Sequence, residues 1–446
     1  MANTYLTRTT GTPTLGTKCT VSVWVKLGEV PNGGGSDRWI FGEYGNGSNH
    51  SYLYLRNSSE IGWYEADGSG AVASIITNRL CRDLSGWYHF MIAYDTTLAT
   101  QADRFKLYIN GERETSFSTN TNNISQNYLP RINKASRTYH IGGVNGVQTM
   151  FNGLMSHYHH CDGSALEPSV FGETDTATGE WKIKTSPSFT LGNNGFTILK
   201  DGMTITDQSS NSNNFTLAGG TLTKSEDNPS NNFATLNALN QTNSNATFSH
   251  GNNTLAVSGN WLGATSTIGV FKGKWYFEWL SDGNNHGAGI CQIGKRMSWT
   301  TEISTGNNGY LGKYNDTWSF YNNGNSAYKL TNDTTTSYGS DLANGDIGMF
   351  ALDADNGKIW AGKNGTWFNS GDPANGTNAM YDSLDNSFGW LVGVFGENST
   401  TQANFGNGYF GTTAVSSAGT NASGLGIFEY DVPSGFTAIC TKGLNL

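Results

Sequence analysis

Alternation of apolar and polar residues predicts short β-strands through roughly the first third of the chain. Between positions 21 and 26 valine occupies every odd position, and Ser22, Trp24 and Lys26 fill the even ones. This period of two is typical of a strand with one buried face. The stretch GWYHFMIAYD (86–95) is apolar on both faces, as expected for an inner strand between packed sheets. Asn110-Gly111 ends the next strand and predicts a tight hairpin turn, since both central residues of a type I′ turn need positive φ.

A second series of strands occupies the C-terminal half. It comprises GKWYFEWL (273–280), GAGICQIG (287–294), TWSFYNNG (317–324), DIGMFALDADNGKIWAGKNGTWF (346–368) and GWLVGVFG (389–396). Asp355-Asn356-Gly357 and Lys363-Asn364-Gly365 predict two more hairpin turns. Neither half has a helical period, apart from a turn after Glu167-Pro168. The pattern therefore predicts an all-β protein with two β-sandwich domains of the jelly-roll type in tandem.

The length of 446 residues agrees with two domains, because a single core rarely serves so long a chain. The segment from about 191 to 247 is polar and rich in Asn and Ser, and the junction is expected near 224–230. We predict a first domain at 1–200, a polar linker at 201–228 and a second domain at 229–446.

Composition excludes several classes of function. Charged residues make up 14% of the chain and aromatic residues 12%, and the net charge of -9 is not gathered in any run, so no nucleic-acid partner is expected. The N-terminus lacks a secretory signal and no apolar run could cross a membrane, so neither Sec export nor membrane insertion is expected. Five cysteines are scattered without metal-knuckle spacing and are expected to be reduced and mostly buried: Cys19, Cys81, Cys161, Cys291 and Cys440.

The stretch MSHYHHCDGSAL (155–166) gathers three histidines, a cysteine and an aspartate, and it raises the question of a metal site. On a strand His157, His159 and Cys161 share one face, and the side chains between them share the other. Three successive residues on one face span about 13 Å, too far to converge on one zinc ion. We therefore interpret the stretch as a half-buried strand and expect no metal.

Two further groups of acidic residues are candidate sites. Glu173, Asp175 and Glu180 are the nearest match to the Glu-x-Asp-x-x-Glu strand of glycosidases, but GETDTATGEW (172–181) is typical of a turn. Retaining glycosidases need two carboxyl groups about 5 to 5.5 Å apart across the bond they cleave.

The DADNG run at 353–357 suggests calcium, but a hairpin turn fits better because Asn364 stands where an EF-hand needs glutamate. We predict no catalytic residues and no cofactor; a single calcium ion elsewhere in the first half stays open.

The first half resembles a laminin G-like domain of the concanavalin A-like jelly-roll superfamily. The resemblance lies in CTVSVWVKL, GWYHFMIAYD, FKLYINGE and FNGLMSHYHHCDGSALEPSVFGE. The second half resembles a SPRY domain through GKWYFEWL, GAGICQIG and GDIGMFALDADNGKIWAGKNGTW. The resemblances imply two β-sandwiches that bind ligands with their loops.

The order of segments carries a further resemblance. A start like MANTYLTRT, then FNGLMSHYHHCDG, DQSSNSNNFT, DNPSNNFATLNAL and a closing FEYDVPSGFTAICTKGL is similar to virion proteins of tailed phages, particularly marine ones. The resemblance implies a virion surface protein, made in the host cytoplasm without a signal peptide. The sequence departs from typical tail fibres, because it shows no obvious N-terminal attachment domain and no coiled-coil trimerisation stretch.

These observations lead to a functional hypothesis with two alternatives. We expect a non-enzymatic tail fibre or receptor-binding adhesin that contacts other virion proteins and recognises a host surface glycan or protein. The first alternative is a decoration protein that cements capsid or tail subunits, and the second is a carbohydrate-active enzyme. Either virion role favours a homo-oligomer, a trimer being one form.

Aromatic residues in Asn- and Gly-rich loops of the second half are the candidate ligand-binding residues. Aromatic rings stack on sugar faces, and amide or carboxylate groups bond to hydroxyls. Strand alternation puts Trp318 and Tyr321 on opposite faces, so one of those faces is expected to be core. The candidate residues are Trp299, Tyr310, Tyr314, Trp318, Tyr321 and Trp367.

Overall fold

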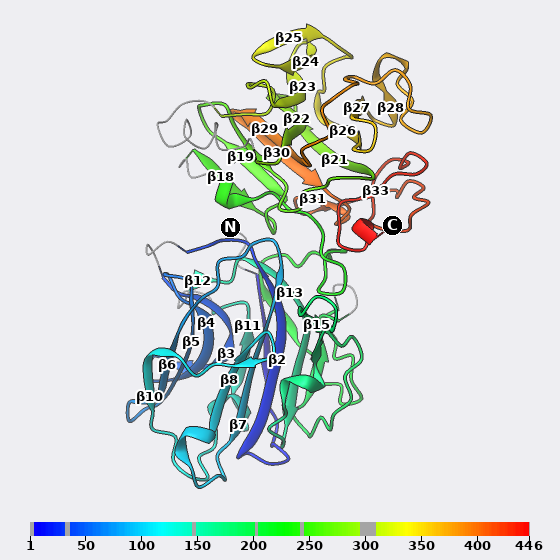
Figure 1. Cartoon of the computed structure of the whole chain (residues 1–446). Helices are drawn as coiled ribbons and strands as arrows, with labels where there is room; N and C mark the ends of the chain where they lie inside the picture. Colours follow the sequence, from blue (N-terminus) through cyan, green and yellow to red (C-terminus); the bar gives the residue numbers. More distant parts are fainter. Residues whose placement is uncertain are drawn as a thin grey trace. The chain divides into compact units, whose positions relative to one another are not determined.

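A computed structural model describes the chain in six ranges, namely residues 4–31, 36–144, 149–200, 204–240, 245–294 and 309–445. The chain divides into two compact units, residues 1–224 (unit 1) and 225–446 (unit 2). Strands dominate both units (Figure 1), which confirms the predicted all-β class. The helices among the described residues are single 3₁₀ turns: η1 Gln101–Asp103, η2 Arg131–Asn133, η3 Pro168–Val170, η4 Ala238–Asn240, η5 Phe368–Ser370 and η6 Gly443–Asn445. None of them has the length or apolarity to span a bilayer.

Unit 1 is a sandwich of two sheets. Within the described residues the larger sheet has the order β10-β6-β5-β4-β3-β11-β1-β17, with β12 beside β3, and the smaller has β16-β13-β2-β7-β8-β9. The larger sheet comprises β1 Tyr5–Thr9, β3 Arg38–Asn46, β4 Asn49–Leu55, β5 Glu60–Asp67, β6 Ala71–Leu80, β10 Phe117–Asn122, β11 Thr138–Ile141, β12 Thr149–Met150 and β17 Thr216–Gly219. The smaller comprises β2 Lys18–Leu27, β7 Trp87–Asp95, β8 Phe105–Ile109, β9 Glu112–Arg113, β13 Gly153–Asp162 and β16 Phe196–Ile198.

Large aromatic side chains join the two sheets of unit 1. The Trp63 indole N–H of β5 donates to the Tyr94 hydroxyl of β7 over 2.8 Å. Phe41 of β3 meets Tyr158 of β13 edge to face, with ring centroids 5.5 Å apart. These residues are fully buried, so burial of their apolar surface between the sheets stabilises unit 1.

One sequence expectation for unit 1 is wrong: β2 is buried on both faces rather than one. The cause is a cover formed by the hairpin of β14 (Gly172–Thr174) and β15 (Trp181–Ile183). Its Trp181 indole donates to His89 Nδ1 over 3.1 Å, and His89 Nε2 is 2.8 Å from the Ser22 hydroxyl. The polar side of β2 thus faces a second layer instead of solvent.

Part of the stretch expected as a linker is built into unit 1. Strand β17 pairs with β1, and the Thr197 N–H donates to Asp207 Oδ1 over 2.9 Å. The division between the units falls after Lys224.

Unit 2 is a second sandwich. In the described ranges its larger sheet has the order β18-β19-β30-β21-β26-β27-β28, with β33 beside β21, and its smaller sheet has β20-β29-β22-β23-β24-β25. The larger comprises β18 Ala246–Ser249, β19 Thr254–Val257, β21 Lys274–Asp282, β26 Asn344–Asp353, β27 Lys358–Lys363, β28 Thr366–Trp367, β30 Ser399–Asn404 and β33 Thr437–Ala438. The smaller comprises β20 Leu262–Thr265, β22 Asn285–Gln292, β23 Thr317–Asn323, β24 Ala327–Thr331, β25 Thr334–Ser337 and β29 Trp390–Glu397, while β31 Tyr409–Phe410 pairs with β32 Thr413–Ala414.

Alternation along the central strands gives unit 2 two apolar layers. Phe277 and Trp279 of β21 point into the core between the sheets, where Trp279 packs on Phe320. Tyr276, on the opposite face of β21, packs in a second cluster with Phe428 and Phe436 of the C-terminal segment. The C-terminal segment therefore covers the outer face of the larger sheet.

The Asn-Gly turns are present as predicted. Asn110 and Gly111 have φ of 50° and 80°, and Asn364 and Gly365 have 48° and 83°. Each pair joins strands two residues apart, β8 to β9 and β27 to β28, so both are type I′ hairpins. The predicted turn at 355–357 likewise joins β26 to β27.

Candidate functional site

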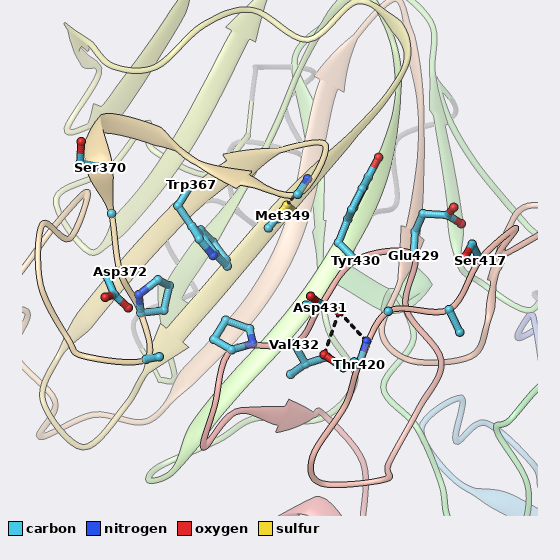
Figure 2. Close-up of a pocket in the computed structure, with 17 residues that line it drawn as sticks. Met349, Trp367, Ser370, Asp372, Ser417, Thr420, Glu429, Tyr430, Asp431 and Val432 are labelled. Atoms are coloured by element: carbon cyan, nitrogen blue, oxygen red, sulfur yellow. Dashed lines mark hydrogen bonds between the residues drawn. The ribbon is translucent and has the colours of Figure 1, made fainter.

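An open cleft of about 770 Å³ lies on the outer face of the larger sheet of unit 2. Three separate parts of the chain line it: Met349 on β26, residues 365–374 around β28 and η5, and residues 417–433 of the C-terminal segment. Figure 2 shows Met349 in view between Trp367 and Tyr430, with Asp372 beyond Trp367 and Asp431 beside Thr420. The cleft is therefore assembled from residues far apart in the sequence.

The hairpin turn of β27 and β28 sets the aromatic wall. The Gly365 N–H donates to Met349 Sδ over 3.1 Å, and a Cβ at Gly365 would lie 3.0 Å from the Tyr430 ring. Trp367 follows on β28, and its ring meets Tyr276 edge to face with centroids 6.2 Å apart. Trp367 and Tyr430 are half-buried, so each ring is supported on one side and reaches solvent on the other.

A buried carboxylate holds the C-terminal wall of the cleft in place. Glu278 of β21 is fully buried, and it accepts the backbone N–H groups of Glu429 and Tyr430, each over 2.9 Å. The Tyr276 hydroxyl also donates to it over 2.9 Å. Burial raises the pKa of Glu278 to about 7, even though the two backbone N–H groups act to lower it.

Three carboxylates at the cleft are fixed by neutral donors. Asp431 Oδ1 accepts the backbone N–H and the hydroxyl of Thr420, over 2.6 and 2.8 Å. Asp372 accepts the backbone N–H and a side-chain amide N–H of Asn375, and Glu429 accepts the backbone N–H and the hydroxyl of Ser416. These hydrogen bonds hold the pKa of Asp431 and of Asp372 below the usual value. Both groups are therefore ionised at neutral pH.

The aromatic residues predicted from the sequence lie in different parts of unit 2. Tyr310, Tyr314 and Tyr321 gather with Trp261 over Phe395, outside the smaller sheet. The Trp261 ring centroid lies 5.2 Å from that of Tyr310 and 5.3 Å from that of Tyr321.

Trp318 packs instead against the central core, edge to face with Trp390 at 5.7 Å. Alternation thus correctly put Trp318 and Tyr321 on opposite faces, and the face of Trp318 is the core. Among the candidates only Trp367 lines the cleft, while Trp299 lies outside the described residues.

Sequence reasoning missed Tyr430, Asp431 and Asp372. The closing motif FEYDVPSGF (428–436) pairs an aromatic with an acidic residue, and that pairing was the available signal. Nothing in the sequence indicates that this motif meets the turn at 364–365, because the meeting depends on the fold.

The histidine-rich strand of unit 1 is part of a packed interior. Residues 156–162 are all buried, and a bulge interrupts pairing between Ser156 and His159. His159 Nδ1 is 2.9 Å from the Thr197 hydroxyl and stacks on Phe171, whereas His160 stacks on Phe196. Burial lowers the pKa of His159 to about 3 and that of His160 to about 4.

The sequence predicts a half-buried strand, whereas this stretch is buried on both faces. The difference arises because other residues of unit 1 pack or hydrogen-bond against each face. Within the described residues, no three His, Cys, Asp or Glu side chains are grouped so that they could hold a metal ion. The five cysteines are free and buried, as predicted.

The acidic stretch at 172–181 is a salt-bridged hairpin. Asp175 accepts the backbone N–H groups of Thr178 and Ala177, and the Lys182 ammonium lies 3.1 Å from it. These contacts, the backbone bond from Thr178 first, lower the pKa of Asp175 to about 2. Glu173 forms salt bridges with Lys182 and Lys184 over 3.5 and 3.9 Å.

Comparison with known proteins assigns the fold of unit 1. Residues 2–168 match the family described as the concanavalin A-like lectin/glucanases superfamily, so this part of unit 1 has the concanavalin A-like jelly-roll fold. No curated protein gives a significant match to the chain.

Several solved structures are similar to part of the chain. The TRIM65 PSpry domain is 12% identical with a TM-score of 0.29, over 38% of this chain and 91% of that one. The SPRY domain of human HERC1 is 15% identical with a TM-score of 0.26, over 35% and 91%. The heptameric SAP-like pentraxin from Limulus polyphemus is 16% identical with a TM-score of 0.27, over 37% and 72%.

Proposed function

We propose that this chain is a non-enzymatic binding protein of a phage virion surface that holds a host surface glycan or protein. The observation that carries the binding role is the open cleft with Trp367 and Tyr430 on its walls. The order of sequence segments, similar to that of tailed-phage virion proteins, supports the place on the virion. A tail fibre or receptor-binding adhesin is the form of this role that we favour.

The geometry of the cleft supports recognition by preformed contacts. Glu278 and the Asn364-Gly365 turn fix both sides of the aromatic wall before any ligand arrives. A preorganised site loses less conformational entropy on binding than a flexible loop does. Weak binding at one cleft would be multiplied by the copies of a homo-oligomer, and by the copies on each particle.

The surroundings of the carboxylates support binding rather than hydrolysis. Asp431 and Asp372 are both ionised, so neither is suited to act as a general acid near neutral pH. In unit 1, Glu173 and Asp175 share the lysine Lys182 on an exposed hairpin. A glycosidase needs one carboxyl group whose pKa is raised, opposite a second that stays ionised.

Immunogold electron microscopy of intact virions with antibody against this chain tests the proposal. Gold on the tail or at fibre tips is the expected result, and the purified chain should then compete with virions for adsorption to host cells. Gold spread over the head, with adsorption unchanged by the purified chain, would favour the decoration role. Virions without gold would refute the virion assignment.

A further inference from the structure

We infer that the cleft of unit 2 takes a lysine or arginine side chain from an extended segment of a partner protein. The inference rests on the proposed binding role of the cleft and specifies the chemistry of its ligand. It follows from the charge of the cleft walls, from their apolar floor and from the open form of the site.

The charged residues that line the cleft are all acidic. Asp372, Glu429 and Asp431 line it, and the described lining residues include no lysine, arginine or histidine. Each carboxylate accepts hydrogen bonds from neutral groups of Asn375, Ser416 or Thr420. Among the described residues none of the three forms a salt bridge, so their charges are not neutralised within the protein. Walls of one sign focus the field and attract a ligand of the opposite sign.

The floor of the cleft suits the aliphatic stem of a long basic side chain. Trp367 and Pro433 are half-buried and offer apolar surface to the cleft. The nearly buried Met349, Pro373 and Val432 also line it. Lysine and arginine bury their methylene stems on apolar surface while the charged head reaches a polar rim. A cation over the face of a tryptophan or tyrosine ring gains further attraction, and Trp367 and Tyr430 provide such faces.

The same features disfavour other ligand classes. Uncompensated carboxylates repel phosphate groups, which argues against nucleic acid and anionic lipid. A neutral sugar would use the rings but would leave the three negative charges without a counterpart. A protein segment with a basic residue satisfies both the apolar floor and the charge, and the open cleft leaves room for the chain on either side of that residue.

Matched short peptides test the inference directly. A Gly-Ser peptide with one central arginine is titrated into the full chain, followed by calorimetry or by NMR into the millimolar range. A second peptide carries citrulline in place of arginine, which keeps the shape and removes the charge. The arginine peptide should bind at least about tenfold more tightly, the difference that one charge-assisted contact of about 1.4 kcal/mol gives.

Variants then locate the binding. Asp431→Asn retains the Oδ1 acceptor that Thr420 uses and removes the charge, so it should weaken the arginine peptide about tenfold without loss of the fold. Asp382→Asn is the matched control, because Asp382 is exposed and lies outside the cleft. Its affinity should equal that of the wild type, and a thermal unfolding scan of each variant verifies that it is folded.

Three results would overturn the inference: equal binding of the citrulline peptide, equal loss in Asp382→Asn, or no binding of the arginine peptide at millimolar concentration. A neutral glycan that binds in a manner dependent on Trp367 would also overturn it, and would leave the proposed binding role standing. The binding role itself fails if no glycan or protein ligand depends on Trp367.

Discussion

Glu65 in unit 1 and Glu278 in unit 2 are buried carboxylates in similar chemical surroundings, and they support different kinds of structure. Glu65 accepts from the Tyr94 and Tyr128 hydroxyls and from the Arg131 N–H, over 2.6 to 2.8 Å. Glu278 accepts from one tyrosine hydroxyl and from the N–H groups of two consecutive residues. Burial raises the pKa of both.

The difference lies in what each carboxylate holds. Beside Glu65 the side chain of Arg131 pairs with Glu43, and both are almost fully buried. The region around these three residues is therefore closed to solvent. The segment that Glu278 holds carries Tyr430 and Asp431, which line an open cleft. The same device, a buried acceptor for distant backbone N–H groups, therefore completes a core in one unit and supports a binding surface in the other.

Breaking the closed region should have the largest effect on stability. Arg131→Met leaves Glu43 buried without its partner, and it should lower the free energy of unfolding of unit 1 by about 3 to 5 kcal/mol. Urea denaturation measures the change. Arg113→Met is the matched control, because Arg113 and Asp103 form an exposed pair, and its cost should stay below about 1 kcal/mol. Equal costs for the two variants would show that the buried pair adds nothing to the closed region.

The next largest effect should be the contribution of Glu278 to the pH dependence of stability. Its pKa of about 7 in the folded protein exceeds its ordinary value of 4.5, so between these values the folded state binds a proton that the unfolded chain has lost. The free energy of unfolding therefore falls as pH rises from about 4.5 to about 7, by on the order of 3 kcal/mol.

Glu278→Gln removes this titration, so the difference between wild type and variant in urea denaturation should change across that pH window and be constant above it. A difference that does not vary with pH would mean that Glu278 is ionised throughout, with the backbone donors outweighing burial.

Alanine in place of the glycine of either Asn-Gly turn should lower stability by an intermediate amount. A Cβ at Gly111 would lie 2.5 Å from the Trp181 ring, and one at Gly365 would lie 3.0 Å from the Tyr430 ring. Both residues have φ above +60°, so alanine at either should cost about 1 to 2 kcal/mol. Only Gly365→Ala should also weaken ligand binding, because it displaces a residue of the cleft. Equal loss of binding in Gly111→Ala would contradict the assignment of binding to the cleft.

Metal removal should have the smallest effect. The side chains of the histidine-rich strand are hydrogen-bonded within unit 1, for example Cys161 to the Thr190 carbonyl and Asp162 to the Thr14 N–H. Dialysis against EDTA should therefore leave the midpoint of thermal unfolding unchanged. A decrease of several degrees, reversed by one metal, would reveal a metal site in the chain.

Features that depend on neighbouring residues could be predicted from the sequence, and features that depend on distant ones could not. The Asn110-Gly111 and Asn364-Gly365 turns are local, and alternation separated Trp318 from Tyr321. Which of these two faces is core depends on the packed sheet. The cover over β2 and the meeting of Gly365 with Tyr430 join segments far apart in the chain, so no local pattern indicates them. For this reason the sequence predicted only one residue of the cleft, Trp367.

The central claim is that the cleft around Trp367 is where this protein binds its ligand. The most direct test is to apply wild type, Trp367→Ala and Phe271→Ala side by side to a glycan array and a peptide array. Phe271 is the control because it is 63% exposed and lies outside the cleft. We predict ligands that bind the wild type and Phe271→Ala and fail to bind Trp367→Ala. Ligands that bind all three proteins equally would contradict the account.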